Sequence, residues 1–265
     1  MNRRRFVAGG TLNRGLTLAF YAPMANASEK QSHLPIPILK EELSSGRTRY
    51  IDNHPIFARL ARGDLTRFHY LAYLRETYHL VKHTPKYLSL AAERTHATDR
   101  RLSNYFGEFG REETGHELLC IKDIEALGEN AGAIISGDPS PGVWGIVTQC
   151  YFWATIGNPV ALLGDAFATE ELGISRGVEV ATLVQTKLGI PRKATNFLRL
   201  HGSEDEMHFE AAVQEIARYA DEPELHAGIK YSTRMTYRYY GQLFTDVLER
   251  GDDWHSLLPE NQQTV

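Results

Sequence analysis

The sequence predicts an all-α protein of about seven or eight helices packed as one bundle. After residue 30, apolar residues recur at helical spacing along most of the chain, while strand-like alternation and Asn-Gly hairpin signals are absent. No internal repeat with a period of about 20–50 residues is visible. At 265 residues, 42% of them hydrophobic, the chain is long enough for one large domain with a full core. We therefore expect residues 31–265 to form a single helical domain.

Start and stop signals divide this domain into helices. Asp64 is a suitable N-cap for a long helix, and Gly128 is a suitable C-cap for a later one. Pro85 lacks the amide that would pair with residue 81, so we expect it to kink or divide its helix. Two short helical pieces are expected at 38–43 and 55–63. The expected longer helical segments are 65–95, a stretch after Asp99, 108–127, 143–156, 159–174, 178–188, 194–219 and 222–250.

Residues 1–30 are expected to lie outside the domain, as a disordered tail or an export signal. Arg3-Arg4-Arg5-Phe6, a mildly apolar stretch and the small-x-small sequence Ala25-Asn26-Ala27 resemble a twin-arginine signal. Asn13 and Arg14 interrupt the apolar stretch, which favours a plain basic tail instead. Both the cytoplasm and the periplasm therefore stay open as locations.

Composition restricts the partners. A net charge of -4 without a basic stripe argues against nucleic acid, and no apolar run reaches the roughly 18 residues that cross a bilayer. Cys120 and Cys150 lie in apolar helical segments, which is typical of buried free thiols rather than of a disulfide or a thiolate metal site. We expect a small-molecule substrate, no nucleic acid and no membrane insertion. A homodimer stays open.

His201, Asp205 and His208 form the strongest candidate site. Their offsets of 0, +4 and +7 place all three side chains on one narrow face of a helix with about 3.6 residues per turn. Two imidazoles and a carboxylate on one face supply half of a metal site. The competing interpretation is a solvated helix face, because the surrounding segment is polar.

Two other segments supply candidates for the remaining ligands. Glu113 and His116 form an E-x-x-H pair, the i, i+3 spacing at which bundle helices present a carboxylate and an imidazole to a shared metal. Glu112 is a geometric alternative to Glu113, and a plain surface pair is the competing interpretation. Glu170 and Glu171 compete for the last position, because neighbours point about 100° apart on a helix.

Together these residues would hold two metal ions. Three carboxylates against two divalent ions leave a charge near +1, and mixed nitrogen and oxygen donors suit iron or manganese. A structural zinc site needs only four ligands, and calcium or magnesium prefers oxygen alone. Two redox-active ions with open positions suit O2 activation. The expected ligands are Glu113, His116, Glu170, His201, Asp205 and His208.

This order of motifs resembles the haem-oxygenase-like diiron oxidases and oxygenases. E-x-x-H is followed about 55 residues on by a lone Glu, and about 30 residues further by H-x3-D-x2-H. The resemblance covers residues 52–250, and the family includes enzymes that act on fatty acids, amino acids and amines. Its fold is shared with haem oxygenases, thiaminase II and the pyrroloquinoline-quinone synthase. Some members place the first Glu seven residues before the His, where this chain has Phe109.

The resemblance implies a non-haem diiron oxidase or oxygenase. Its cofactors would be two Fe²⁺ ions, with manganese as the alternative, and O2 would be the co-substrate. Gly164, six residues before Glu170, is similar to the family's lone-Glu helix, and this favours Glu170 over Glu171.

Five further residues are candidates for the substrate pocket. Glu76, His79 and His83 share a helix face and could line the pocket or orient a ligand, although ordinary core or surface positions are the default. Tyr237 and Tyr240 lie on the aromatic face of the last helix, where a role in the core competes with one in the cavity wall.

Two other functions stay open. A metal-independent enzyme of the same fold would be a quinone-cofactor oxidase or a thiaminase-like hydrolase, and a hydrolase of that kind needs a nucleophilic cysteine, for which Cys150 is the candidate by position. A non-catalytic helical binding module would carry the same His and Glu residues by accident. Neither alternative gives a reason for six metal-type ligands.

Overall fold

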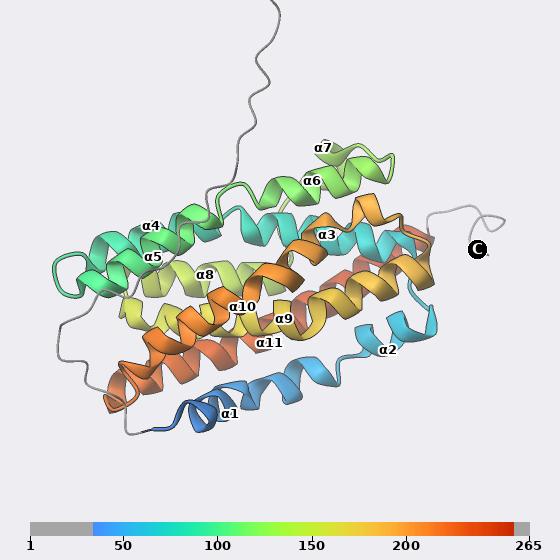
Figure 1. The fold of residues 1–265 in the computed structure, drawn as a ribbon. Coiled ribbons are helices and arrows are strands. Elements are labelled where there is room, and N and C mark those ends of the chain that lie inside the picture. Colours follow the sequence, from blue (N-terminus) through green and yellow to red (C-terminus); the bar gives the residue numbers. More distant parts are fainter. Residues whose placement is uncertain (1–33, 257–265) are drawn as a thin grey trace, which may run out of the picture. The chain divides into compact units, whose positions relative to one another are not determined.

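The chain is all-α throughout the part that the structure describes, as the sequence predicts (Figure 1). This computed structural model describes residues 34–256, apart from the side chains of residues 203–205 and 256. The residues of the predicted export signal lie outside this range. The helices are α1 (Ile36–Arg47), α2 (Pro55–Arg62), α3 (Arg67–Val81), α4 (Thr84–Thr95), α5 (Arg100–Glu112), α6 (Glu117–Ala126), α7 (Ala131–Ile134), α8 (Pro141–Thr155), α9 (Leu162–Leu188), α10 (Asn196–Ala217) and α11 (Pro223–Ser256). Within residues 34–256, none of these helices combines the length and the apolar character that crossing a membrane requires.

The long helices α9, α10 and α11 organise the bundle. Helix α9 packs against both α10 and α11, and α11 also contacts α3 and α8 (Figure 1). Helix α4 pairs with α5, while α6 lies against α3 and α10. The core between them contains fully buried large side chains such as Phe106, Phe167 and Tyr237. This packing brings the end of α5, the start of α6, the middle of α9 and the middle of α10 into one region.

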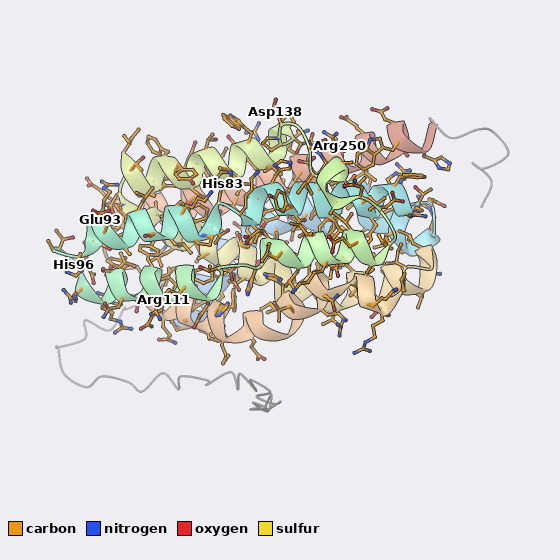
Figure 2. The ribbon with its side chains drawn as sticks, turned by 90° about the horizontal axis from the view of Figure 1, so that it is seen from above. His83, Glu93, His96, Arg111, Asp138 and Arg250 are labelled. Carbon is orange, nitrogen blue, oxygen red and sulfur yellow. The ribbon has the colours of Figure 1, made fainter. Side chains whose placement is uncertain are left out.

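Pro85 divides the predicted helix 65–95 into α3 and α4. Figure 2 shows His83 where α3 passes into α4, and Pro85 lies in the first turn of α4, where a missing amide costs no hydrogen bond. The start of α3 differs from the prediction. Its N-cap is Thr66 rather than Asp64, because Thr66 and His69 form a reciprocal capping box.

Helix α9 is one continuous helix of 27 residues where two shorter helices are predicted. Gly173 and Gly177 lower its intrinsic helix propensity, by about 1 kcal/mol each relative to alanine. Tertiary contact outweighs this cost, because at Gly177 the backbone lies directly against α10: a Cβ there would lie 3.0 Å from the Cα of Gly202. The glycine therefore marks a close helix crossing and not a helix end.

Gly164 marks a second close crossing, between α9 and α11. A Cβ at this position would lie 2.2 Å from the carbonyl oxygen of Ile229, so only glycine fits here. This contact holds α9 beside α11 six residues before Glu170. The two cysteines, Cys120 and Cys150, are free and buried, as predicted.

Candidate metal centre

Glu113 and His116 lie at a turn between two helices, and not within one helix as predicted. Helix α5 ends at Glu112 and α6 begins at Glu117, and Gly115 between them has φ +94°. This left-handed conformation favours glycine, because a Cβ would clash with the neighbouring backbone. Glu113 is only 6% exposed, and its Oε2 lies 3.2 Å from the Nδ1 of His116. The turn therefore aims both side chains at the same region.

Helix α10 supplies His201. The Nδ1 of its ring lies 3.0 Å from the carbonyl oxygen of Phe197, and the two rings stack with centroids 4.1 Å apart. Donation from Nδ1 leaves the lone pair on Nε2, which is how protein carbonyls commonly orient a metal-binding histidine. The ring of His116 meets that of His201 edge-on, with centroids 5.1 Å apart. The two imidazoles thus come from different helices to one place.

His208, two turns further along α10, lies between two carboxylates. Its Nε2 is 3.0 Å from Glu112 Oε2, and its Nδ1 faces Glu170 Oε2 at 3.6 Å. Glu112 is largely exposed and meets the outer side of the ring. It is thus placed to orient His208 rather than to replace Glu113 in the cluster. The side chain of Asp205 is not described, so its role as a ligand stays a prediction.

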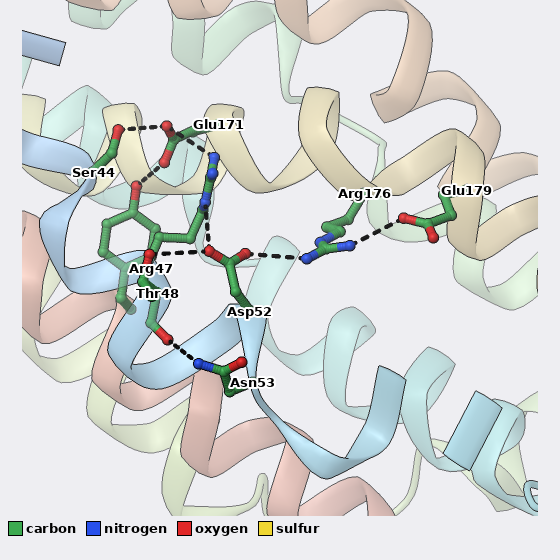
Figure 3. A network of polar contacts seen from close by, with 9 residues as sticks. Ser44, Arg47, Thr48, Asp52, Asn53, Glu171, Arg176 and Glu179 are labelled. Carbon is green, nitrogen blue, oxygen red and sulfur yellow. Dashed lines mark hydrogen bonds and ion pairs between the residues drawn. The ribbon is translucent and has the colours of Figure 1, made fainter. Parts of the chain in front are cut away.

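Glu170 and Glu171 point in different directions from α9. Glu170 is buried and faces His208. Glu171 accepts hydrogen bonds from the hydroxyls of Ser44 and Tyr237, and its Oε1 lies 3.2 Å from Arg47 Nη1 (Figure 3). The polar partners of Glu171 therefore belong to α1 and α11 and not to the histidine cluster.

The cluster consists of two overlapping groups of potential ligands. Glu113, His116 and His201 form one, and Glu113, Glu170 and His208 form the other. In each group the donor atoms lie within 4.8 Å of one another. Glu113 belongs to both groups, as a carboxylate that bridges two metal ions would.

Electrostatics within the cluster reflect its burial. Burial raises the pKa of Glu170 to about 7, against the effect of His208 and with a contribution from Glu113. Burial also disfavours the charged form of His208, but Glu170, Glu112 and Glu113 outweigh it and raise the pKa of His208 to about 9. The pKa of Glu113 is lowered, because its bond to His116 and the nearby histidines outweigh the effect of burial.

Two buried atoms support a metal cation at this place. Glu170 Oε2 and His208 Nδ1 are shielded from solvent and face each other at 3.6 Å, which is too far for a hydrogen bond, and neither atom has another hydrogen-bond partner among the described residues. A divalent cation that displaces the proton of His208 would accept a lone pair from each of these two atoms, and its charge would compensate the buried carboxylates of Glu113 and Glu170. The residues present therefore fit a metal centre with mixed nitrogen and oxygen ligands.

A cavity of about 180 Å³ opens beside the cluster. Glu113, Glu170 and His201 line it, and most of the remaining wall is apolar, from α3, α8, α9 and α11. Examples are Leu80, Ile146, Leu162, Leu243 and Val247. An apolar cavity with a few convergent polar groups is the usual form of a small-molecule site.

Only Tyr240, among the five predicted pocket residues, lines this cavity. Glu76 forms ion pairs with Arg75 and Arg250 and accepts a hydrogen bond from the amide of Ser140. His79 Nε2 lies 3.0 Å from the carbonyl oxygen of Ile135.

The other two pocket candidates also have partners outside the cavity wall. His83 Nδ1 lies 3.1 Å from the hydroxyl of Tyr151, and Tyr237 donates to Glu171. Asp165, by contrast, lines the cavity and was not singled out from the sequence. Its only signal there was an acidic residue in a small, apolar helical segment, five positions before Glu170.

Residues 71–241 match the model of a protein family described as iron-containing redox enzymes. No curated protein matches the chain. A domain of unknown function from Shewanella denitrificans, which has a haem oxygenase-like fold, is 21% identical with a TM-score of 0.77. The match covers 85% of this chain and 97% of that one.

Two further solved structures are similar. A TenA homologue from Pseudomonas syringae pv. tomato is 13% identical with a TM-score of 0.67, covering 83% of this chain and 98% of that one. A CADD-like protein of unknown function from Nostoc punctiforme is 17% identical with a TM-score of 0.63, covering 82% and 98%. At such identities the likeness shows the fold alone. The predicted haem-oxygenase-like fold is thus confirmed.

Proposed function

This chain belongs to the family of iron-containing redox enzymes, and from that premise we propose that it is a diiron oxidase or oxygenase. It would use O2 to oxidise or cleave a small organic substrate. The observation that carries the proposal is the pair of overlapping ligand groups that share Glu113. A single-metal site would need only one such group. Two Fe²⁺ ions held there would supply the redox chemistry with O2.

Each of the two ions would have its own ligands. His116 and His201 would hold one ion and Glu170 and His208 the other, with Glu113 between them. Asp205 would add a further carboxylate, since its register on α10 is one turn after His201.

Other groups of the chain would support these ligands. The Phe197 carbonyl and the Glu112 carboxylate fix the rings of His201 and His208. The apolar cavity beside the cluster would exclude bulk water and position the substrate against the centre.

The proposal is tested by anaerobic titration with Fe²⁺, followed by exposure to O2. We expect the protein to bind two irons per chain, one for each ligand group, and then to consume O2. Glu113→Gln should lose most iron at both positions, because it removes the shared ligand. His116→Ala should lose about one of the two irons. Binding of a single iron, or an unchanged iron content in Glu113→Gln, would contradict the proposal.

Cys150 does not favour the thiaminase-like alternative. Its side chain is fully buried, burial raises the pKa of its thiol well above the ordinary value, and it does not line the cavity. A nucleophilic cysteine needs an accessible thiolate. The non-catalytic alternative predicts neither iron uptake nor O2 consumption, so the same titration tests it.

A further inference from the structure

Asp165 is a buried carboxyl group that lines the cavity beside the candidate metal centre. It is 4% exposed and lies on α9. Asp165 lies five positions before Glu170, which places the two residues about 7.5 Å apart along the helix axis. The proposed function uses Glu170 and leaves Asp165 without a role.

The partners of Asp165 are all neutral. Its Oδ1 accepts a hydrogen bond of 2.8 Å from the hydroxyl of Thr236, while its Oδ2 meets the hydroxyl of Tyr87 only at 3.4 Å. The thiol of Cys150, a weak donor, is the remaining neighbour. Burial accordingly raises the pKa of Asp165. One oxygen of this carboxyl group therefore lacks a strong donor.

Some other buried carboxylates of the chain have cationic partners, whereas Asp123 and Asp246 accept hydrogen bonds from amide groups. Glu76 is paired with Arg75, and Glu215 with Arg218. Among the described residues, Asp165 has no such partner. A buried carboxylate is stable when a cation or several strong donors compensate its charge. A cationic ligand in the cavity would supply that compensation.

Outside the metal centre, the groups of the described cavity wall that can be cationic are already occupied or neutral. His69 has its Nε2 3.0 Å from Asp252, and burial lowers the pKa of its ring. Arg176 is the one guanidinium group among the lining residues that the structure describes. It is already bound by two carboxylates, those of Asp52 and Glu179, at 3.1 Å each (Figure 3). No lysine lines the described cavity wall. Away from the proposed metal ligands, the cavity thus favours a positive group over a carboxylate.

The size and walls of the cavity restrict the rest of the ligand. About 10–15 Å³ of such volume holds one water-sized group, so 180 Å³ holds roughly a dozen non-hydrogen atoms. The apolar wall favours an aliphatic or aromatic body. Tyr87 and Tyr240, which also line the cavity, offer ring faces that attract cations.

We propose that the cavity binds a primary amine with an apolar body, and that Asp165 holds its ammonium group. The role of this amine as the oxidised substrate rests on the proposed diiron function, whereas its binding does not. The amine would lie between Asp165 and the ligand cluster, at a distance that α9 sets.

Binding can be measured by calorimetry with three probes of matched chain length: n-octylamine, n-octanol and octanoate. Each is titrated into the metal-free protein and into the anaerobic Fe²⁺-loaded protein. We expect octylamine to bind about tenfold or more tightly than octanol in both forms, because one charge-assisted hydrogen bond distinguishes them. Asp165→Asn should abolish this preference and leave octanol affinity and iron content unchanged.

Asp246→Asn is the matched control. Asp246 is also a buried carboxylate, but it accepts from the amide of Gly142 and from Gln242 and does not line the cavity. Its replacement should leave the preference for octylamine intact. If Asp165→Asn fails to fold, Asp165→Glu decides the matter, since it retains the charge and should retain the preference.

Three results would overturn the proposal: equal affinities for octylamine and octanol, tighter binding of octanoate in the metal-free protein, or an unchanged preference for octylamine in Asp165→Asn. If Asp165→Glu is the decisive variant, loss of its preference for octylamine would do the same. The iron content of each sample separates this proposal from the proposed function. Amine selectivity without iron binding would leave Asp165 as an amine site and remove the diiron assignment. Iron binding without amine selectivity would retain the diiron assignment and remove the amine site at Asp165.

Discussion

At the scale of single residues, Glu170 and Glu171 are adjacent carboxylates with different surroundings. Glu170 faces His208, whereas Glu171 faces Arg47 and Tyr237. We expect Glu170→Gln to lower the iron content by about one per chain, because it removes a charged ligand from one of the two groups. Glu171→Gln should leave the iron content unchanged and lower the free energy of unfolding by about 1–3 kcal/mol.

Iron quantification after anaerobic loading, together with urea unfolding, measures both effects. The two variants differ from the parent by the same chemical change at neighbouring positions. Equal loss of iron from both would show that the side-chain directions do not decide which carboxylate binds metal.

His79 makes stability depend on pH. Burial, together with Lys82 and Arg75, lowers the pKa of His79 to about 4. Since histidine in an unfolded chain titrates near pH 6.5, the unfolded chain binds this proton first as the pH falls. The contribution of neutral His79 to stability is therefore complete above about pH 6.5 and is lost as the pH falls towards about 4.

We expect His79→Gln to lose less unfolding free energy between about pH 7 and about pH 4.5 than the parent does. The loss should shrink without vanishing, because burial also lowers the pKa of His54, His69 and His83. Urea denaturation across this range measures the slope. His96→Gln, at an exposed position, is the control. A slope in His79→Gln equal to that of the parent would rule out this account.

At the scale of elements, the turn between α5 and α6 matters most, because it aims Glu113 and His116 into the cluster. Gly115 holds this turn with a left-handed φ, and Gly128, at the end of α6, has a left-handed φ as well. An alanine in such a conformation costs about 1–2 kcal/mol at either position. We therefore expect Gly115→Ala and Gly128→Ala to lower stability by similar amounts.

Iron binding should separate the two glycine variants. Relief of the strain at Gly115 moves the turn that carries two proposed ligands, whereas a Cβ at Gly128 meets nothing within 4 Å and no proposed ligand is close in sequence. Gly115→Ala should thus lose iron and Gly128→Ala should retain it. Iron content and urea unfolding of the same samples test this, and equal iron contents would contradict it.

At the scale of the whole molecule, the sequence predicts those features of the fold and the candidate site that depend on local periodicity. Helical spacing predicts the all-α fold and the common face of His201 and His208, and Pro85 predicts the division between α3 and α4. The continuity of α9 was not predictable in this way, because the packing of Gly177 against Gly202 of another helix overrides a local signal.

The break at Gly115 escaped prediction for a similar reason. A single glycine between two helical stretches is compatible with one helix or with two, and only the surrounding packing decides between them. The environment of Asp165 likewise depends on Tyr87 and Thr236, which are 78 and 71 residues away in the chain. Residue types and spacing therefore locate the candidate ligands, whereas charge balance in the cavity needs the fold.

Metal binding should stabilise the molecule as a unit, because the proposed ligands come from the α5–α6 turn, α9 and α10. These segments are distant in sequence, so the unfolded chain presents no such site, and binding favours the folded state alone. At free Fe²⁺ about 100-fold above the dissociation constant, the gain is about 2.7 kcal/mol per site. For a domain of this size, each occupied site thus raises Tm by about 5–10 °C.

Thermal unfolding measures this shift. It is monitored by circular dichroism under anaerobic conditions, first with Fe²⁺ and then after addition of a chelator. The increase should be reversed by the chelator and should be much smaller in Glu113→Gln, which lacks the shared ligand. Gly128→Ala provides the control, since it is destabilised but retains every ligand and should show the full increase. If Fe²⁺ raised the Tm of Glu113→Gln as much as that of the parent, Fe²⁺ would have to stabilise the fold by binding at another site. The cluster that joins these three segments would then contribute nothing to the increase in Tm.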